Sequence, residues 1–205
     1  MAFSIRLPKQ HAWWRFLAFA RPLSEPPQNS PLSSSANAQT NSSAFEAFFW
    51  RYERLILAYL CRMTGDEQAA SDLCQETFFR AWQHFEQIRE GAEGRGWLFR
   101  VATNLALHHL RHMRAHPNVL LDDDLLPGAS DPGGRIVEQD LINQTLQRLT
   151  AQQRSALLLH EVYGWECEAI GKMLGISRAA VKMALWRARE QFRVQYLRER
   201  SAQDE

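Results

Sequence analysis

The chain has 205 residues, of which 45% are hydrophobic, and its formal net charge at pH 7 is +1. This length is enough for one or two small domains with cores. The near-neutral charge excludes a polycation, so any affinity for nucleic acid must come from local segregation of charge. Apolar residues recur at intervals of three and four, and no apolar run is long enough to span a bilayer. We therefore predict an all-α fold with no stable membrane insertion.

The three cysteines, Cys61, Cys74 and Cys167, form no CxxC pair and no even framework. Such isolated cysteines are typical of reduced, partly buried thiols, which favours a cytoplasmic protein.

The first 44 residues are predicted to lie outside the folded protein. An aromatic island at residues 11–20 is interrupted by Arg15, and no clear small-x-small cleavage site follows it, which argues against a signal peptide. The island fits either a short interfacial helix or a disordered extension. Residues 22–44 are rich in Ser, Asn, Gln and Pro, which is linker composition. We expect residues 1–44 to be a disordered extension and the fold to start near Ala44.

Two helices are predicted between Phe45 and Phe85. Apolar residues at helical spacing run from Phe45 to Met63, Gly65 ends that helix, and Asp66 can cap the next one. The second helix leaves Asp72, Gln75, Glu76 and Phe79 largely on its outer surface. An aromatic side chain beside acids is either ordinary surface or a docking face for a partner.

The third predicted helix, Trp97 to Arg114, is basic. No acidic residue occurs from Arg95 to Arg114. Cations that follow a backbone, with aromatic rings that stack or wedge bases, are how single-stranded DNA is held; a merely solvated basic face is the alternative. His108, His112 and His116 share one helical face, but no nearby Cys or carboxylate completes a metal site. We predict no metal and no cofactor.

A Pro-, Gly- and Asp-rich segment at residues 115–135 is predicted to be a flexible acidic linker between two helical domains. A helix follows from Ile136 to Leu149. Thr150 and Gln153 then have the spacing of a capping box, which starts a helix that ends at Gly164.

The segment from Gly164 to Arg193 predicts a helix-turn-helix. Gly175 breaks the first helix and Ser177 can cap the second. The second helix has an apolar stripe on one side and a cationic surface on the other, with a single acid, Glu190. This pattern suits phosphate neutralisation and base contacts in a DNA major groove. The alternative is an amphipathic surface helix with a solvated basic face.

Three motifs, in this order and spacing, resemble the extracytoplasmic-function (ECF) group of bacterial sigma-70 family factors. DLCQETFFRAW at residues 72–82 is similar to the core-binding segment of that family, and WLFRVATN at residues 97–104 is similar to its promoter-melting helix. Leu149–Arg154 together with Gly164–Arg189 resembles its region 4. The likeness covers about Phe45 to Tyr196, and implies sigma region 2 at residues 45–114 and sigma region 4 at residues 136–200.

The resemblance implies promoter-specific transcription initiation with core RNA polymerase and promoter DNA as partners, and an anti-sigma factor as a family expectation. The polymerase contacts it implies are Asp72, Gln75, Glu76 and Phe79. The −10 element would meet Arg95, Trp97, Arg100, Asn104 and His108, with the loop before Trp97 holding a flipped base. The −35 element would meet Arg178, Lys182, Met183, Trp186 and Arg187. The acidic linker would thread toward the RNA exit channel.

The chain departs from the family pattern in places. Met183 and Ala184 stand where a hydroxyl and a cation are usual, Gly171 where Ala is usual, and His108 where Asp or Asn is frequent. An unusual −35 sequence is the implied consequence. A stand-alone helix-turn-helix regulator is the alternative function, which has no need of the motifs at residues 72–82 and 97–104. No Gly-rich phosphate loop or supported nucleophile set occurs, so an enzyme is not predicted.

Overall fold

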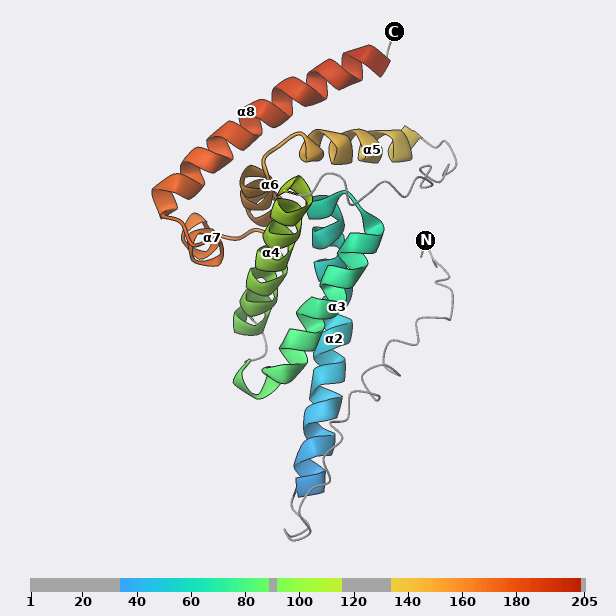
Figure 1. Ribbon diagram of the computed structural model, residues 1–205, viewed down its shortest axis with the longest axis vertical. Coiled ribbons are helices and arrows are strands. Elements are labelled where there is room, and N and C mark those ends of the chain that lie inside the picture. Colours follow the sequence, from blue (N-terminus) through green and yellow to red (C-terminus); the bar gives the residue numbers. More distant parts are fainter. Residues whose placement is uncertain (1–33, 89–91, 116–133, 204–205) are drawn as a thin grey trace. The chain divides into compact units, whose positions relative to one another are not determined.

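The computed structural model describes residues 34–88, 92–115 and 134–203, and this part of the chain is helical without strands, as predicted (Figure 1). Its elements are α2 (Ser34–Thr64), α3 (Glu67–Gln83), η1 (Phe85–Gln87), α4 (Ala92–Ala115), α5 (Gly134–Gln147), α6 (Ala151–Leu157), η3 (Leu158–Val162), α7 (Cys167–Leu174) and α8 (Arg178–Gln203). The aromatic island and residues 116–133 of the acidic linker lie outside the described residues, so the predictions for them remain expectations.

Helices α2 to α4, with η1, form what we call the N-terminal module. The predicted apolar stripe of α2 is buried from Phe45 to Met63. Gly65 ends the helix at φ 75°, and the carboxylate of Asp66 accepts a hydrogen bond from the Ala69 amide to start α3. One boundary was wrong: α2 begins at Ser34 rather than near Ala44. The last proline of the preceding segment is Pro31, so nothing in residues 34–44 forbids helix.

Helices α5 to α8, with η3, form the C-terminal module. The Thr150 hydroxyl accepts from the Gln153 amide and the Gln153 side chain accepts from the Thr150 amide, so the predicted capping box is confirmed. Gly175 ends α7 in the left-handed region at φ 68°, and the Ser177 hydroxyl accepts from the Ala180 amide at 3.1 Å to start α8. The helix-turn-helix is thus built as predicted. The sequence did not indicate the single π-helical turn η3.

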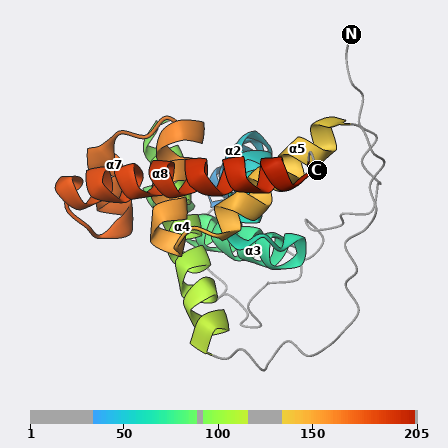
Figure 2. The ribbon, with the colours of Figure 1, turned by 90° about the horizontal axis from the view of Figure 1, so that it is seen from above.

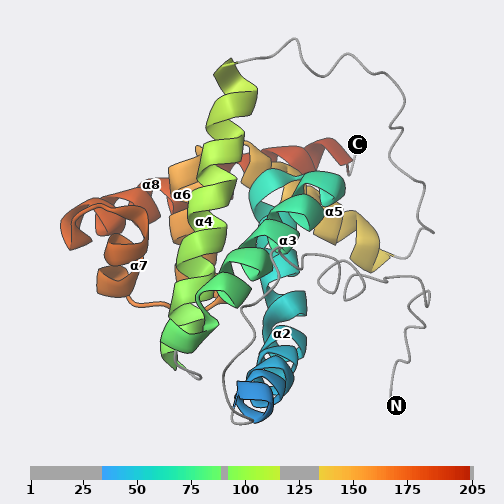
Figure 3. The same ribbon diagram turned by 60° about the horizontal axis from the view of Figure 1, so that its bottom comes forward.

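The two modules share one hydrophobic core. Helix α4 packs on α3 on one side and on α6 and α7 on the other (Figures 1 and 3). Helix α8 contacts α7, α6 and α5 in turn along its length (Figure 2). Because α4 belongs to the N-terminal module, its contacts with α6 and α7 join the modules into one buried cluster.

The cysteines are free thiols, as predicted. Burial raises the pKa of Cys74 to about 12 and also raises that of Cys61, so neither thiol is activated as a nucleophile. Among the described helices, none is long and apolar enough to cross a membrane.

Candidate nucleic-acid and partner interfaces

The outer surface of α3 carries the first predicted site. Thr77, Phe78 and Ala81 turn inward, which leaves Phe79 42% exposed on the opposite side. Asp72 and Gln75 are exposed beside it, and Glu76 is half-buried. Glu76 is held by an ion pair with Arg80 at 2.7 Å, and Asp72 accepts from the Gln68 amide at 3.3 Å. We call Asp72, Gln75, Glu76 and Phe79 the α3 face; it presents one uncovered aromatic ring among acceptors.

Three of the five residues predicted for the −10 element lie together on α4. Arg100, Asn104 and His108 are spaced four residues apart and are all exposed, so they form one polar strip along the helix, which we call the α4 face. No ionic partner of Arg100 occurs within the described residues, so its charge is available to an anion.

The other two −10 candidates are also in α4, but outside the α4 face. Trp97 is half-buried against the core, with its ring 6.2 Å from that of His84. Arg95 is turned toward the C-terminal module: its guanidinium donates to the Tyr163 carbonyl at 2.8 Å and lies 4.9 Å from the centre of the Trp165 ring. The structure therefore does not place Arg95 on the α4 face.

The predicted −35 residues share one surface of α8. Val181, Leu185 and Ala188 are buried, as the predicted stripe requires. The residues that remain outside, which we call the α8 face, are Arg178, Lys182, Met183, Trp186 and Arg187, and all five are exposed. Met183 is 50% and Trp186 65% exposed, so the face offers apolar contact as well as charge.

Beyond the α8 face, two cations of the helix are neutralised locally. Arg189 donates to the Glu161 carboxylate at 2.9 Å, and Arg193 pairs with Glu190 at 2.8 Å. The cations of the α8 face, Arg178, Lys182 and Arg187, lie in the first half of α8, where a helix-turn-helix approaches DNA.

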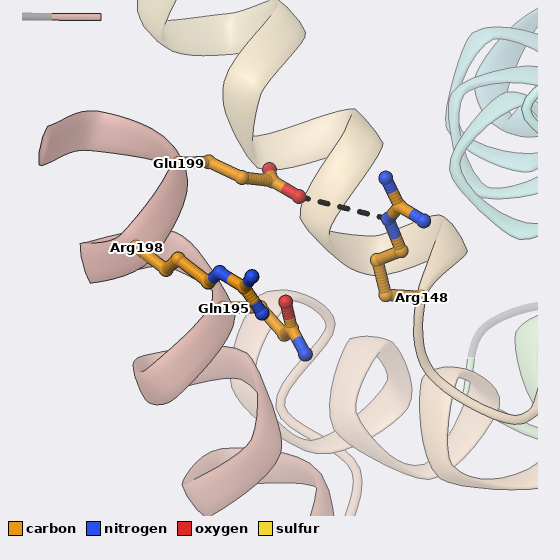
Figure 4. Close-up of a pocket in the computed structure, with 4 residues that line it drawn as sticks. All are labelled: Arg148, Gln195, Arg198 and Glu199. Carbon is orange, nitrogen blue, oxygen red and sulfur yellow. Dashed lines mark ion pairs between the residues drawn. The ribbon is translucent and has the colours of Figure 1, made fainter. Parts of the chain in front are cut away.

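A shallow groove between α5 and α8 is lined by Arg148, Gln195, Arg198 and Glu199 (Figure 4). Arg148 and Glu199 form an ion pair across it at 3.6 Å. None of the predicted site residues lies in this groove. The carboxylate of Glu199 is already engaged by Arg148 and by the Thr145 hydroxyl, which donates to it at 3.2 Å. Among its described residues, the groove therefore offers no free acid or base.

Sequence reasoning missed the contact between the modules. Tyr163 places its ring 5.5 Å from Tyr59 and 4.8 Å from Phe99, both in the N-terminal module. Arg154 and Trp165 reach the same module. A signal was present, because Gly164 lies between two large aromatic residues at the end of a helix, but the sequence does not say what those rings contact.

Within the described residues, no group of three His, Cys, Asp or Glu side chains is placed to hold a metal ion. His116, the third histidine of the predicted row, lies outside those residues, so the row as a whole is untested.

An all-α module with an exposed acidic and aromatic helix, followed by a helix-turn-helix module, defines a sigma-type arrangement of two regions. Residues 48–115 match the family model Sigma-70 region 2, and residues 139–192 match the model Sigma-70, region 4.

The chain is also similar to ECF RNA polymerase sigma factors. The chain is 33% identical over 156 residues to the ECF RNA polymerase sigma factor SigL of Mycobacterium tuberculosis, covering 74% of this chain and 88% of that protein. It is 32% identical over 177 residues to SigG of the same organism, covering 72% of this chain but only 47% of SigG, so it spans about half the length of that relative. The chain belongs to the ECF family of RNA polymerase sigma factors.

Solved structures agree on the fold. The sigma factor RpoE of Bartonella quintana, in complex with the anti-sigma factor NepR, superposes with a TM-score of 0.60 at 20% identity, over 74% of this chain and 96% of that one. At that identity the likeness concerns fold alone.

Proposed function

We propose that this protein binds core RNA polymerase and directs it to specific promoters, with the C-terminal module on the −35 element and the N-terminal module on the −10 element. The observation that carries this proposal is the presence in one chain of three exposed faces with different chemistry. The α3 face is aromatic and acidic, whereas the α4 and α8 faces are polar or cationic. A stand-alone DNA-binding regulator would need only the α8 face.

The α3 face supports the polymerase role. Phe79 is 42% exposed, and Asp72 and Gln75 surround it with groups that hydrogen-bond. A large exposed aromatic ring within a polar rim is the composition of an interface hot spot. The partner we propose is a surface of the polymerase core that is basic and apolar.

The α8 face supports duplex recognition. Arg178, Lys182 and Arg187 can neutralise phosphates, which sets affinity and its dependence on salt. Met183 and Trp186 provide apolar surface that can meet the methyl group of thymine in the major groove. Their presence supports an unusual −35 sequence.

The α4 face supports contact with the melted −10 element. Arg100 supplies charge for the backbone, while Asn104 and His108 supply hydrogen-bonding groups along one strip. The chemistry of bond formation belongs to the polymerase, so the chain is not proposed to be an enzyme. Since the polymerase core is cytoplasmic, the proposed site of action is the cytoplasm. An anti-sigma partner remains a further expectation.

Co-purification with bacterial core RNA polymerase tests the proposal. We expect stoichiometric binding by the wild type and its loss in the Gln75→Ala/Phe79→Ala double variant, because the α3 face loses its aromatic centre and a hydrogen-bonding neighbour. The matched control is Trp50→Ala/Gln87→Ala, which removes one exposed aromatic ring and one exposed amide outside α3 in the N-terminal module. The control should bind core as the wild type does.

A wild-type chain that fails to bind core yet shifts a duplex operator would contradict the proposal and favour the stand-alone regulator. Equal loss of core binding in the control variant would show that the α3 face has no special role.

A further inference from the structure

Arg95 is the feature of the module contact that the proposed function does not explain. It was predicted to meet DNA, but its guanidinium faces Trp165, at 4.9 Å from the ring centre, and Phe99, at 5.6 Å. It also donates to the Tyr163 carbonyl at 2.8 Å. A flat ring over an arginine guanidinium is the arrangement by which proteins stack an unpaired base on arginine. In this structure the flat group is supplied by the C-terminal module.

Trp165 is held in that position by the local backbone. Gly164, at φ 72°, lets the chain turn after η3, and the Trp165 amide donates to the Leu159 carbonyl at 2.9 Å. The indole ring lies edge-on to Phe99 at 5.8 Å and beside Gly96, where an added Cβ would be 3.5 Å from the ring, an ordinary contact distance. Trp165 is therefore ordered by both modules at once.

The contact between Arg95 and Trp165 leaves some hydrogen-bond donors unsatisfied. Arg95 Nε and Trp165 Nε1 are both buried donors, and neither has a hydrogen-bond partner among the described residues. A buried donor without an acceptor weakens the contact that buries it. The indole has a planar bicyclic shape like that of a purine and can cover the guanidinium as a purine would, but its own N–H is buried there without an acceptor from the described residues.

We propose that Arg95 is a stacking platform for an unpaired purine of single-stranded DNA, and that Trp165 occupies this platform in place of the base while the two modules are in contact. The purine gains the same stacking on the guanidinium, and release of Trp165 frees its buried indole N–H from a site where no described residue accepts from it. Binding of the base and the contact of Trp165 with Arg95 exclude each other. The proposal rests on the proposed function, since it names the base-binding platform of the N-terminal module.

If Trp165 and an unpaired base compete for Arg95, removing Trp165 should strengthen the binding of single-stranded DNA. The test measures fluorescence anisotropy of a 5′-fluorescein-labelled dA octamer with the full-length chain at one fixed salt concentration. Trp165→Ala is expected to lower the Kd by roughly five- to tenfold, the effect of freeing one stacking platform. The gain should disappear in Arg95→Ala/Trp165→Ala. The matched control, Trp50→Ala, deletes an exposed tryptophan outside the proposed DNA-binding faces and should leave the Kd unchanged.

Trp165→Phe keeps an aromatic ring in the contact, so it tests the proposal even if Trp165→Ala does not fold. If circular dichroism shows that Trp165→Ala has lost helix, the smaller ring of Trp165→Phe is still expected to tighten binding at least about twofold. Unchanged Kd in both variants, or a gain that survives the removal of Arg95, would overturn the proposal.

Core binding of the same preparations separates the two proposals. If the wild type and Trp165→Ala both bind core but the octamer affinity does not change, only the inference about Trp165 fails. If neither binds core, the proposed function fails as well.

Discussion

The guanidinium of Arg154, in α6, donates a hydrogen bond to the backbone carbonyl of Met63, in the last turn of α2. The same side chain donates to the carbonyls of Leu146, Gln147 and Leu149, at 2.8, 3.0 and 3.2 Å. Arg154 is 3% exposed, and burial lowers its pKa to about 10, which still leaves it charged at neutral pH. One buried cation therefore satisfies the C-terminal carbonyls of helices from both modules.

Replacing Arg154 by Met should lower the free energy of unfolding by about 3 to 5 kcal/mol, because several buried carbonyls lose their only charged donor at once. Arg154→Lys should recover little of this, since an ammonium group cannot reach acceptors spread around a planar fork. Urea denaturation followed by circular dichroism measures the change. Arg148→Met is the control: its side chain is 68% exposed, so we expect a change within about 0.5 kcal/mol.

Stability should fall above about pH 10 because of Tyr59. Its hydroxyl lies 2.8 Å from Thr103 Oγ1, and burial raises the pKa of Tyr59 above its ordinary value of about 10. The unfolded tyrosine then loses its proton while the folded one keeps it, so the folded state binds more protons and loses stability as pH rises.

Urea midpoints measured from pH 8 to pH 11 test this. Tyr59→Phe should be less stable than the wild type at pH 8 by about 1 kcal/mol, through loss of one hydrogen bond. Between pH 10 and 11 it should lose up to about 1.4 kcal/mol less than the wild type does. Parallel curves for the two proteins would contradict the expected role of Tyr59. The residual slope is assigned to the other groups whose pKa is raised by burial, which are Cys74, Cys61 and Tyr163.

Lys182→Ala/Arg187→Ala should weaken initiation at promoters that depend on the −35 element and leave core binding unchanged. Both cations are exposed on the α8 face, away from the α3 face. In duplex binding, the slope of log K against log salt should flatten by roughly 1 for each phosphate that the variant no longer neutralises. Arg198→Ala/Arg200→Ala removes the same charge from the far end of α8 and serves as the control. An equal fall in core binding would show that the roles are wrongly assigned.

Gly171→Ala should destabilise the helix-turn-helix, although Ala is the better helix former by about 1 kcal/mol. A Cβ at Gly171 would lie 2.7 Å from the Ile176 carbonyl oxygen, a backbone atom of the turn that cannot move alone. Gly96→Ala is the matched control, since its Cβ would meet only ordinary contact at 3.5 Å and should leave the protein equally or more stable. Thermal unfolding of both variants decides between helix propensity and steric clash.

Local patterns in the sequence were enough for the elements and for the exposed faces of individual helices. The stripe from Phe45 to Met63, the capping box at Thr150 and the turn between Gly175 and Ser177 depend on neighbours within a few residues. The α8 face also follows from periodicity, because burying Val181 and Leu185 leaves Lys182 and Trp186 outside. The start of α2 was placed too late, because the Ser-, Asn- and Gln-rich composition of residues 34–44 is compatible both with a linker and with a helix.

What only the tertiary structure decided is where side chains from distant parts of the chain meet. Arg95, in a basic segment, reads as a free cation in the sequence, but it is covered by Trp165, 70 positions along the chain. Gly171 reads as a weak helix residue, but it is required by the approach of the turn. Arg154 reads as part of a surface helix, but it is the buried link between modules. Helical periodicity specifies which face of a helix is apolar, whereas the partner of that face depends on packing in three dimensions, which no local pattern contains.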